Sequence, residues 1–285
     1  MNSNYSIATV VAALLMLMLG TSSCHDRKPA PTDSVAPEPT TDTTSSDTLS
    51  KVLEEQPMPK AADELFDDFF FNFAGNRKLQ RHRIVFPLPV YRNGKLAGNI
   101  EQRNEWKIDH FFMRQDYYTL IFDNNAQMNL SKDTTIDHVV VEKIFFHQKM
   151  VKQYLFNRIK GKWWLTSLNF KPMYQNNNAS FLKFYSRFST DSAFQVHSMN
   201  STVTFTAPDP DNDFSNITGT MTPEQWPSFK PAIIPQGIIY NIVYGQKYTE
   251  SNQKIFVIRG IANSLEIDMT FKKRHGRWKL MKFNQ

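Results

Sequence analysis

The chain has 285 residues, of which 41% are hydrophobic and 13% aromatic, and its formal net charge is +6. This composition excludes a chain that is disordered throughout, because enough apolar surface is present to build packed cores. The length exceeds that of a usual single domain and favours two compact domains. Lysines and arginines are scattered along the chain rather than clustered, so nucleic acid is not an expected partner.

The first 23 residues predict a signal peptide. An apolar run at residues 7–19 is shorter than the roughly 20 residues needed to span a bilayer, and small residues follow it up to Cys24. Cys24 is the only cysteine, and its position resembles that of the lipidated cysteine of bacterial lipoproteins. We therefore expect membrane attachment through an N-terminal lipid on Cys24, in the bacterial cell envelope at the outer membrane, facing the periplasm or the surface. Plain secretion is the alternative.

Residues 24–60 predict a disordered tether, because they are rich in proline, threonine, serine and acidic residues. Triplets that begin at Asp33, Asp42 and Asp47 resemble O-glycosylation acceptor sites of some Gram-negative bacteria. An ordinary solvated linker is the alternative interpretation.

The remaining sequence contains one pattern twice. Gly161 and Trp163 recur as Gly276 and Trp278, and both pairs are separated by 115 residues (276 − 161 and 278 − 163). Each pair lies in or just after a short basic turn between two runs of alternating apolar and polar residues. This pattern predicts a β-hairpin with one buried face.

Each copy is also predicted to open with an amphipathic helix. At residues 63–74 and 180–189, aromatic residues recur at spacings of three and four, which is typical of a helix with one apolar face. Ser180 is the predicted N-cap of the second helix. Two further pairs keep the same offset: Gln80 with Gln195, and His82 with His197. We interpret residues 61–173 and 174–285 as two copies of one domain.

Alternating patterns predict most of the remaining elements as strands. The first copy is predicted to hold strands at 84–91, 116–123, 138–146, 149–159 and 162–170, with a second helix at 105–113 capped by Asn104. The second copy is predicted to hold strands at 201–206, 238–248, 254–261, 265–274 and 278–283, with an acidic loop after the first of them.

A helix-first order that ends in long antiparallel strands, with a glycine turn before Trp-x-Leu, resembles the nuclear transport factor 2-like (NTF2-like) cone, also called cystatin-like. The residues that carry this resemblance are Gly161, Trp163 and Leu165, repeated as Gly276, Trp278 and Leu280. The whole chain also resembles a family of exported Gram-negative lipoproteins for which no activity is established. The resemblance implies an α+β protein with two tandem cone-shaped domains, each with helices packed on a curved antiparallel sheet. It gives these glycines and tryptophans a structural role.

Cones of this kind often hold a small molecule, so the resemblance implies a pocket in one or both of them. Candidate pocket-lining residues are Trp106, His110, Tyr117, Tyr118, Glu142, Trp226, Tyr240 and Tyr244. Neighbours on a strand point to opposite faces, so only one of Tyr117 and Tyr118 can face the interior. The same alternation favours solvent exposure of Glu142, Glu266 and Asp268. If one of these carboxylates were buried beside aromatic rings, its pKa would rise and a role as a general base would become credible.

No cofactor is expected, and a metal site is only weakly indicated. Asp209, Asp211 and Asp213 have the spacing of a calcium loop, but Phe214 and Thr220 stand where that loop needs Gly and Glu. An acidic turn is the favoured interpretation. The histidines lack the spacing of a zinc site, and no glycine-rich phosphate loop or Gly-x-Ser-x-Gly elbow occurs.

The sequence therefore favours a lipid-anchored envelope protein whose two cones bind a small molecule, a glycan or an envelope protein without catalysis. One alternative is an enzyme with a small-molecule pocket in one cone, of isomerase or dehydratase type. Another is a structural part of an envelope complex, in which sheet faces pair within the chain or in a homodimer. The lining of the two cone interiors distinguishes these hypotheses.

Overall fold

The computed structural model describes residues 58–209, 211–246 and 251–285. The predicted signal peptide, Cys24 and almost all of the predicted tether lie outside these residues. In the described part of the chain, no helix is both long enough and apolar enough to cross a membrane.

The two copies both open with two helices followed by six strands, but a short helix follows the third strand in the first copy and precedes it in the second. The first copy holds α3 (Phe66–Gly75), α4 (Arg77–His82), β1 (Leu88–Arg92), β2 (Lys95–Ile100), β3 (Tyr117–Phe122), α5 (Asn125–Met128), β4 (His138–Phe145), β5 (Met150–Ile159) and β6 (Lys162–Pro172). The second holds α6 (Ala179–Phe188), α7 (Ser192–His197), β7 (Met199–Asp209), β8 (Asn212–Met221), α8 (Trp226–Phe229), β9 (Ile238–Val243), β10 (Gln253–Gly260), β11 (Glu266–Arg274) and β12 (Arg277–Asn284). Short 3-10 helices lie at Lys60–Asp63, Arg103–Glu105, Asn129–Lys132, Met173–Gln175 and Pro223–Gln225.

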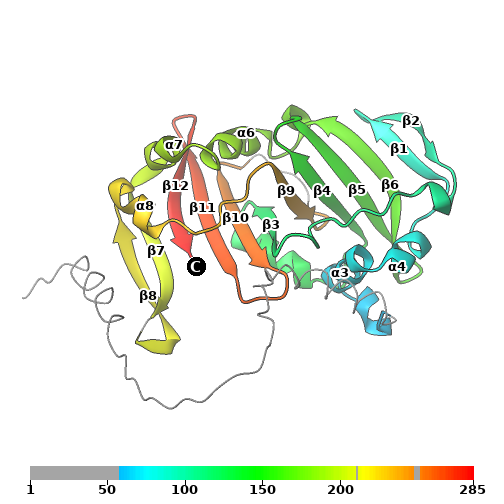
Figure 1. Ribbon diagram of the computed structural model, residues 1–285, viewed down its shortest axis with the longest axis horizontal. Coiled ribbons are helices and arrows are strands. Elements are labelled where there is room, and N and C mark those ends of the chain that lie inside the picture. The colour runs from blue at the N-terminus through cyan, green and yellow to red at the C-terminus, as the bar shows by residue number, and fades with distance from the viewer. Residues whose placement is uncertain (1–57, 210, 247–250) are drawn as a thin grey trace, which may run out of the picture. The chain divides into compact units, whose positions relative to one another are not determined.

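These strands form two six-stranded curved sheets, and each sheet contains one strand from the other copy. The first sheet has the order β2-β1-β6-β5-β4-β9, and the second has the order β8-β7-β12-β11-β10-β3. In Figure 1, β9 of the second copy lies beside the green β4, and β3 of the first copy lies beside the orange β10. The predicted α+β class and cone fold are confirmed. The exchange of β3 and β9 was not predicted, and it joins the two copies by strand pairing.

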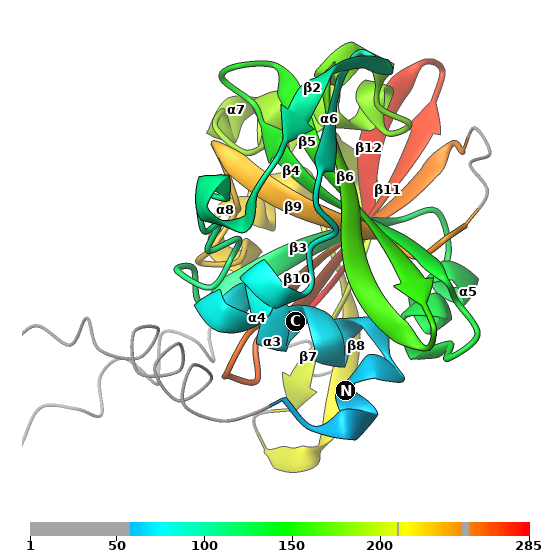
Figure 2. The ribbon, with the colours of Figure 1, turned by 90° about the vertical axis from the view of Figure 1, so that its right-hand side faces the viewer.

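The two exchanged strands also contact each other. The Thr119 hydroxyl on β3 donates to the carbonyl oxygen of Tyr240 on β9 at 2.6 Å, and the Tyr240 amide donates back to that hydroxyl at 3.0 Å. The Ile121 amide donates to Asn241 Oδ1 at 2.8 Å. Figure 2 shows β3 and β9 near the centre of the molecule, between the outer strands of the two sheets. The two copies are therefore joined at buried hydrogen bonds between β3 and β9.

Each of the two aromatic cores forms around one predicted tryptophan and also takes in side chains of the other copy, such as Tyr240 in the first core and Ile121 in the second. Trp163 lies edge-on to Phe66 of α3, with ring centroids 5.0 Å apart, and Trp278 lies edge-on to Phe181 of α6 at 5.5 Å. Both tryptophans are buried. The two tryptophans thus lie in similar surroundings, as a duplicated structural role requires.

The hairpin turns before these tryptophans are also alike. Lys160 and Gly161 have φ values of +49° and +73°, and His275 and Gly276 have φ values of +49° and +75°. Positive φ at both central residues is the geometry of a two-residue type I′ hairpin, which favours glycine at the second position. The glycine at each turn is explained by this backbone requirement.

Gln80 and Gln195 keep one role in both copies. Gln80 Oε1 accepts from Trp106 Nε1 at 3.1 Å, and Gln195 Oε1 accepts from Trp226 Nε1 at 3.0 Å. Each glutamine also donates to a backbone carbonyl, that of Asp109 at 2.7 Å or Phe188 at 2.8 Å. Both glutamines are buried, so each one satisfies the polar edge of a buried tryptophan.

The helix predicted at 105–113 does not form, and Asn104 is not a helix cap. Within that range the structure has the end of a 3-10 helix and a turn from Phe111 onward, and Phe111 has a φ of +47°, which a right-handed helix cannot contain. The Gln80 side chain bonds the backbone of Asp109 on both its N–H and its C=O, replacing the bonds that a helix would have supplied.

Other boundaries also differ from the prediction. Asn178 rather than Ser180 precedes α6, and the Ser180 hydroxyl accepts from Trp278 Nε1 at 3.1 Å instead. The strand predicted from residue 84 begins at Leu88, and the one predicted to end at 248 ends at Val243. Strands β2 and β8 were missed because most of their described side chains are exposed and do not alternate in polarity.

The strand exchange predicts that neither copy folds alone. Residues 58–177 expressed without 178–285 lack the β9 edge for β4, and the second half lacks β3 for β10. We expect each half to give no monomer with a cooperative unfolding transition, and co-expression to restore a 1:1 complex that unfolds at a single temperature. Size-exclusion chromatography and calorimetry measure this, and a half that is monomeric and unfolds cooperatively on its own would contradict it.

A second cross-copy contact makes stability depend on pH. The Tyr244 hydroxyl, just after β9, donates to Asp67 Oδ1 on α3 at 2.8 Å. Burial raises the pKa of Asp67 from 3.8 to about 6, although the Tyr244 hydrogen bond and Arg259 act in the opposite direction. The folded state therefore binds this proton more tightly than the unfolded state. The resulting stabilisation is fully present below pH 3.8 and is lost as the pH rises through about 6.

Asp67→Asn keeps an acceptor for Tyr244 and removes the desolvated charge. We expect this variant to be more stable than the parent at pH 7.5, by about 1–3 kcal/mol, and nearly equal to it close to pH 4. Urea unfolding at both pH values measures the difference. A difference that does not change with pH, or a loss of stability at pH 7.5, would show that the charge of Asp67 is not desolvated.

Candidate functional site

The predicted pocket-lining residues lie mainly in the packed cores. Trp106, Tyr118, Tyr240 and Tyr244 are buried in the first core, Trp226 is buried in the second, and Tyr117 packs on the second. Tyr117 and Tyr118 thus contact different cores, as strand alternation requires. His110 is half-buried in the segment before β3. The structure buries most of these side chains as packing partners, and the Phe112 ring, for example, packs between Tyr118 and Tyr240.

An ionic cluster in the first core centres on Asp109, which the sequence analysis missed. Its carboxylate accepts from the Tyr154 hydroxyl, from the Phe111 amide at 3.0 Å and from Lys143 Nζ at 3.2 Å, and Lys152 Nζ lies 3.6 Å away. Burial alone would raise the pKa of Asp109, but the Tyr154 hydrogen bond and the two lysines outweigh it and lower the pKa. A carboxylate so occupied is a poor general base. Its bonds to Tyr154, Lys143 and Lys152 instead hold the segment before β3 against strands β4 and β5 of the first sheet.

Glu142 is only 3% exposed, so the expectation that it faces solvent is wrong. Its Oε1 accepts from Gln153 at 2.9 Å and from Asn176 at 2.7 Å, and its Oε2 accepts from Asn241 at 3.0 Å. Asn241 lies on the exchanged strand β9, which pairs with β4 beside Glu142. The three amide donors satisfy this buried carboxylate.

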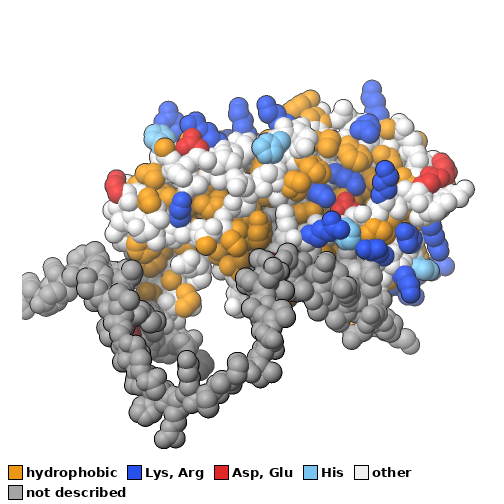
Figure 3. All heavy atoms as spheres, viewed as in Figure 1, with side chains coloured by type: hydrophobic (Ala, Val, Ile, Leu, Met, Phe, Trp, Pro, Cys, Tyr) orange, Lys and Arg blue, Asp and Glu red, His pale blue; other side chains and the backbone are white. Residues whose placement is uncertain are grey.

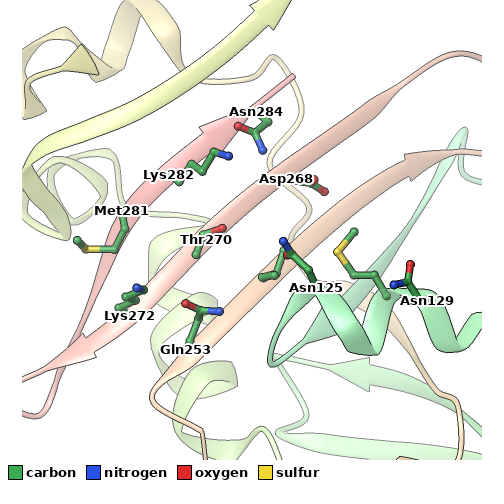
Figure 4. A pocket seen from close by; sticks show the side chains of 11 residues that line it. Asn125, Asn129, Gln253, Asp268, Thr270, Lys272, Met281, Lys282 and Asn284 are labelled. Carbon is green, nitrogen blue, oxygen red and sulfur yellow. The ribbon is translucent and has the colours of Figure 1, made fainter. Parts of the chain in front are cut away.

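An open groove lies over the second sheet, and we call it the polar groove. It has a volume of about 570 Å³ and is lined by Asn125, Met128, Asn129, Gln253, Ile255, Asp268, Thr270, Lys272, Met281, Lys282 and Asn284. Figure 4 shows residues of the helical segment after β3 on one side of the groove and residues of β10–β12 on the other. Because β3 pairs with β10, the strand exchange places this first-copy segment beside second-copy strands.

Two unpaired acceptor atoms are buried in the polar groove. Asp268 on β11 and Asn284 on β12 are direct partners across the strand pair. Asp268 Oδ1 and Asn284 Oδ1 are buried and have no hydrogen-bond partner among the described residues. A buried acceptor left without a donor costs about 1–3 kcal/mol. These two oxygens can therefore accept hydrogen bonds from groups outside the described residues.

The charge around Asp268 is nearly balanced. Burial raises the pKa of Asp268 and Glu266 raises it further, whereas Arg259, Lys282 and the hydrogen bond from Asn284 lower it, with a net rise. Glu266 lines an adjoining depression of about 340 Å³, which shares Asp268, Lys282 and Asn284 with the groove. With Lys272 on the same face, two lysines oppose two carboxylates. Such a surface suits a neutral polar molecule better than an ion.

In the first copy, the residues at the positions of Asp268 and Asn284 bond to each other. Gln153 and Asn169 stand 115 residues before Asp268 and Asn284 (268 − 153 and 284 − 169). Asn169 Nδ2 donates to Gln153 Oε1 at 3.0 Å, and Gln153 Nε2 donates to Glu142. Asn169 Oδ1 is unpaired, as Asn284 Oδ1 is. The Oε1 and Nε2 atoms of Gln153 are both hydrogen-bonded, whereas Asp268 Oδ1 has no partner among the described residues.

The acidic triplet lies at the turn between β7 and β8. Asp209 Oδ1 accepts from the Asp211 amide at 3.0 Å, and Asp209 Oδ2 accepts from the Ser215 hydroxyl at 3.0 Å. The side chain of Asp213 lies outside the described atoms. These bonds are those of an Asx-type turn. Within the described residues, no group of three or more His, Cys, Asp or Glu side chains could hold a metal ion.

Sequence reasoning named Asp268 as a carboxylate of interest but missed Asn284 and the helical side of the groove. The available signal was the match between Asn169 and Asn284 in the two copies, which extends the repeat to the outward face of the last strand. Nothing local in residues 125–129 indicates that they face β10, because that contact depends on the strand exchange.

Comparison with known proteins agrees with the fold. None of the curated proteins compared with this chain matches it. The chain is similar to an NTF2-like protein from Bacteroides fragilis NCTC 9343, whose crystal structure was solved at 2.15 Å. The two share 42% sequence identity and a TM-score of 0.72, over 80% of this chain and 98% of that chain. The family model of a domain of unknown function, DUF4348, matches residues 45–285. The predicted NTF2-like resemblance is thus confirmed, and the chain belongs to the DUF4348 family.

Proposed function

We propose that this protein is a lipid-anchored envelope protein that binds a small, neutral, hydroxyl-rich ligand, such as a glycan, in the polar groove. The observation that carries the proposal is the pair of buried, unpartnered oxygens on Asp268 and Asn284. Hydroxyl groups donate to such oxygens and so remove the cost of leaving them unpaired.

The rest of the lining complements the same ligand. Four carboxamides, those of Asn125, Asn129, Gln253 and Asn284, both donate and accept, as sugar hydroxyls do. Lys272 and Lys282 add donors for ligand oxygens. The volume of about 570 Å³ falls in the usual range of small-molecule sites. The balance of lysines and carboxylates favours a ligand without net charge.

Attachment to the membrane is the second part of the proposal. It rests on the apolar run at residues 7–19, the small residues after it and the single cysteine at position 24. The predicted tether would let the groove reach ligands away from the bilayer. A binding protein held in this way presents its site to the envelope without diffusing from the cell.

Binding of neutral sugars tests the groove. Calorimetric titrations would use cellobiose, maltose and N,N′-diacetylchitobiose, with a glucuronate-containing disaccharide as the charged comparison. We expect at least one neutral disaccharide to bind more tightly than the charged one. Asp268→Ala and Asn284→Ala should each raise its dissociation constant about tenfold, because each removes a buried acceptor.

Asn169→Ala is the matched control, since Asn169 occupies the position of Asn284 in the first copy and lies outside the groove. Its affinity should equal that of the parent. Failure of all three neutral disaccharides to bind, or unchanged binding by both groove variants, would refute the proposed ligand class.

Labelling with an alkyne-bearing fatty acid tests the anchor. Cells expressing the parent chain should incorporate the label, and Cys24→Ala should abolish it, because the thiol is the proposed site of acylation. Ser23→Ala keeps a small residue before the cysteine and should label like the parent. Equal labelling of the parent and Cys24→Ala would refute lipidation at this residue.

A further inference from the structure

A second open site lies at one end of the second copy, where α6 and α7 meet the turn between β11 and β12. We call it the cationic cleft. It has a volume of about 450 Å³ and is lined by Ser180, Lys183, Phe184, Arg187, Phe194, His197, Ser198, Gly276, Arg277, Trp278 and Lys279. Figure 3 shows Lys and Arg side chains in a row along the upper edge of the molecule, over α6, α7 and this turn.

The cleft carries four basic side chains, and its lining holds no acidic residue among those that the structure describes. Arg187 pairs with Asp191 at 3.1 Å, and Lys279 Nζ donates to the carbonyl oxygen of His197 at 2.5 Å. The side chains of Lys183 and Arg277 are exposed and make no hydrogen bond or ion pair with the described residues. Two cations are therefore free to meet an anion.

An aromatic wall stands beside these cations. Phe184 and Phe194 are half-buried, with ring centroids 5.8 Å apart. The Arg187 guanidinium lies over the Phe194 ring, 4.2 Å from its centroid. The floor is Trp278, whose Nε1 is already bonded to Ser180. Apolar surface and free positive charge thus lie within one cleft, which suits a ligand that has an apolar body and an anionic group.

The first copy closes the same place with a plug of two large side chains. Arg83 and Trp164 stand 115 residues before Ser198 and Lys279 (198 − 83 and 279 − 164). Arg83 makes a bidentate ion pair with Asp63, at 2.8 and 2.7 Å. Its guanidinium also lies over the Trp164 ring, 5.7 Å from the centroid.

The plug changes the exposure of the aromatic wall. Phe69 of the first copy lies under the Arg83 guanidinium and is fully buried. Its counterpart, Phe184 (184 − 69 = 115), is half-buried in the cleft. The cleft is therefore open in the second copy because Ser198 and Lys279 replace the stacked Arg83 and Trp164, and not because the fold requires an opening there.

We propose that the cationic cleft binds a small anion carried on an apolar body, such as an aryl or alkyl phosphate, and that the site exists only in the second copy. Lys183 and Arg277 contact the anionic group, while Phe184, Phe194 and Trp278 contact the apolar body. This site is separate from the polar groove, since the two share no lining residue. It stands whether or not the groove binds a glycan.

Isothermal titration calorimetry with the full chain tests the ligand class. The probes are phenyl phosphate, hexyl phosphate, inorganic phosphate and the cation benzyltrimethylammonium. We expect phenyl or hexyl phosphate to bind about tenfold more tightly than inorganic phosphate, and the cation not to bind. The ratio between the first two probes shows whether the apolar body is a ring or a chain. Equal affinity for inorganic phosphate and both organic phosphates, or binding of the cation, would overturn the proposal.

Two variants locate the site. Arg277→Gln removes one free cation and should weaken the tighter organic phosphate about fivefold. The double variant S198R/K279W introduces the first copy's plug without changing net charge, and should abolish binding. Lys95→Gln, on β2 of the first copy, removes an equal charge from an exposed position outside both sites and should bind like the parent.

The double variant is to be checked for a native circular dichroism spectrum. Arg277 is exposed and makes no side-chain bond among the described residues, so its variant tests the site even if the double variant does not fold. Unchanged affinity in Arg277→Gln would refute the placement of the site.

Discussion

The exchange of β3 and β9 is the constraint on which the rest of this structure depends. It pairs β9 with β4 and β3 with β10, so separating the copies would break two strand pairs. It brings Asn241 onto Glu142 and thereby makes a buried carboxylate tolerable. It also carries the helical segment after β3 across to β10, which creates one side of the polar groove. A site formed by both copies therefore follows from the topology.

Much of each cone could be predicted from sequence because its signals are local. The phenylalanine stripes follow helical spacing, and the Gly–Trp corners follow the backbone needs of a tight hairpin. Strand partners are different, since alternation along β3 or β9 is the same whether the strand pairs within its own copy or with the other. The helix wrongly predicted at 105–113 fails for a related reason. A distant side chain, that of Gln80, supplies the backbone bonds and allows the left-handed conformation at Phe111.

The candidate site was harder to predict than the fold. Aromatic residues such as Trp106 and Tyr240 were reasonable pocket candidates by type, but residue type does not distinguish a pocket wall from a packed core. Glu142 was expected in solvent because alternation assumes one open face, but side chains from β5, β9 and the segment before α6 gather around its carboxylate on that face. Of the groove residues, only Asp268 was noticed. Its surroundings depend on strand pairing and on α5, which no local pattern encodes.

The two copies differ in whether the polar side chains at two matched places have hydrogen-bond or ion-pair partners within the chain. In the first, Arg83 and Trp164 close one opening, and Gln153 joins Glu142 in a network at the other. In the second, Asp268 and Asn284 keep unpaired buried oxygens, and the cleft gathers basic side chains that repel one another. Such features destabilise a fold. The exchange lets the first copy compensate, because β9 of the second copy pairs with β4 of the first sheet. Strand pairing between the copies can thus stabilise a copy that keeps unpaired polar groups at its surface.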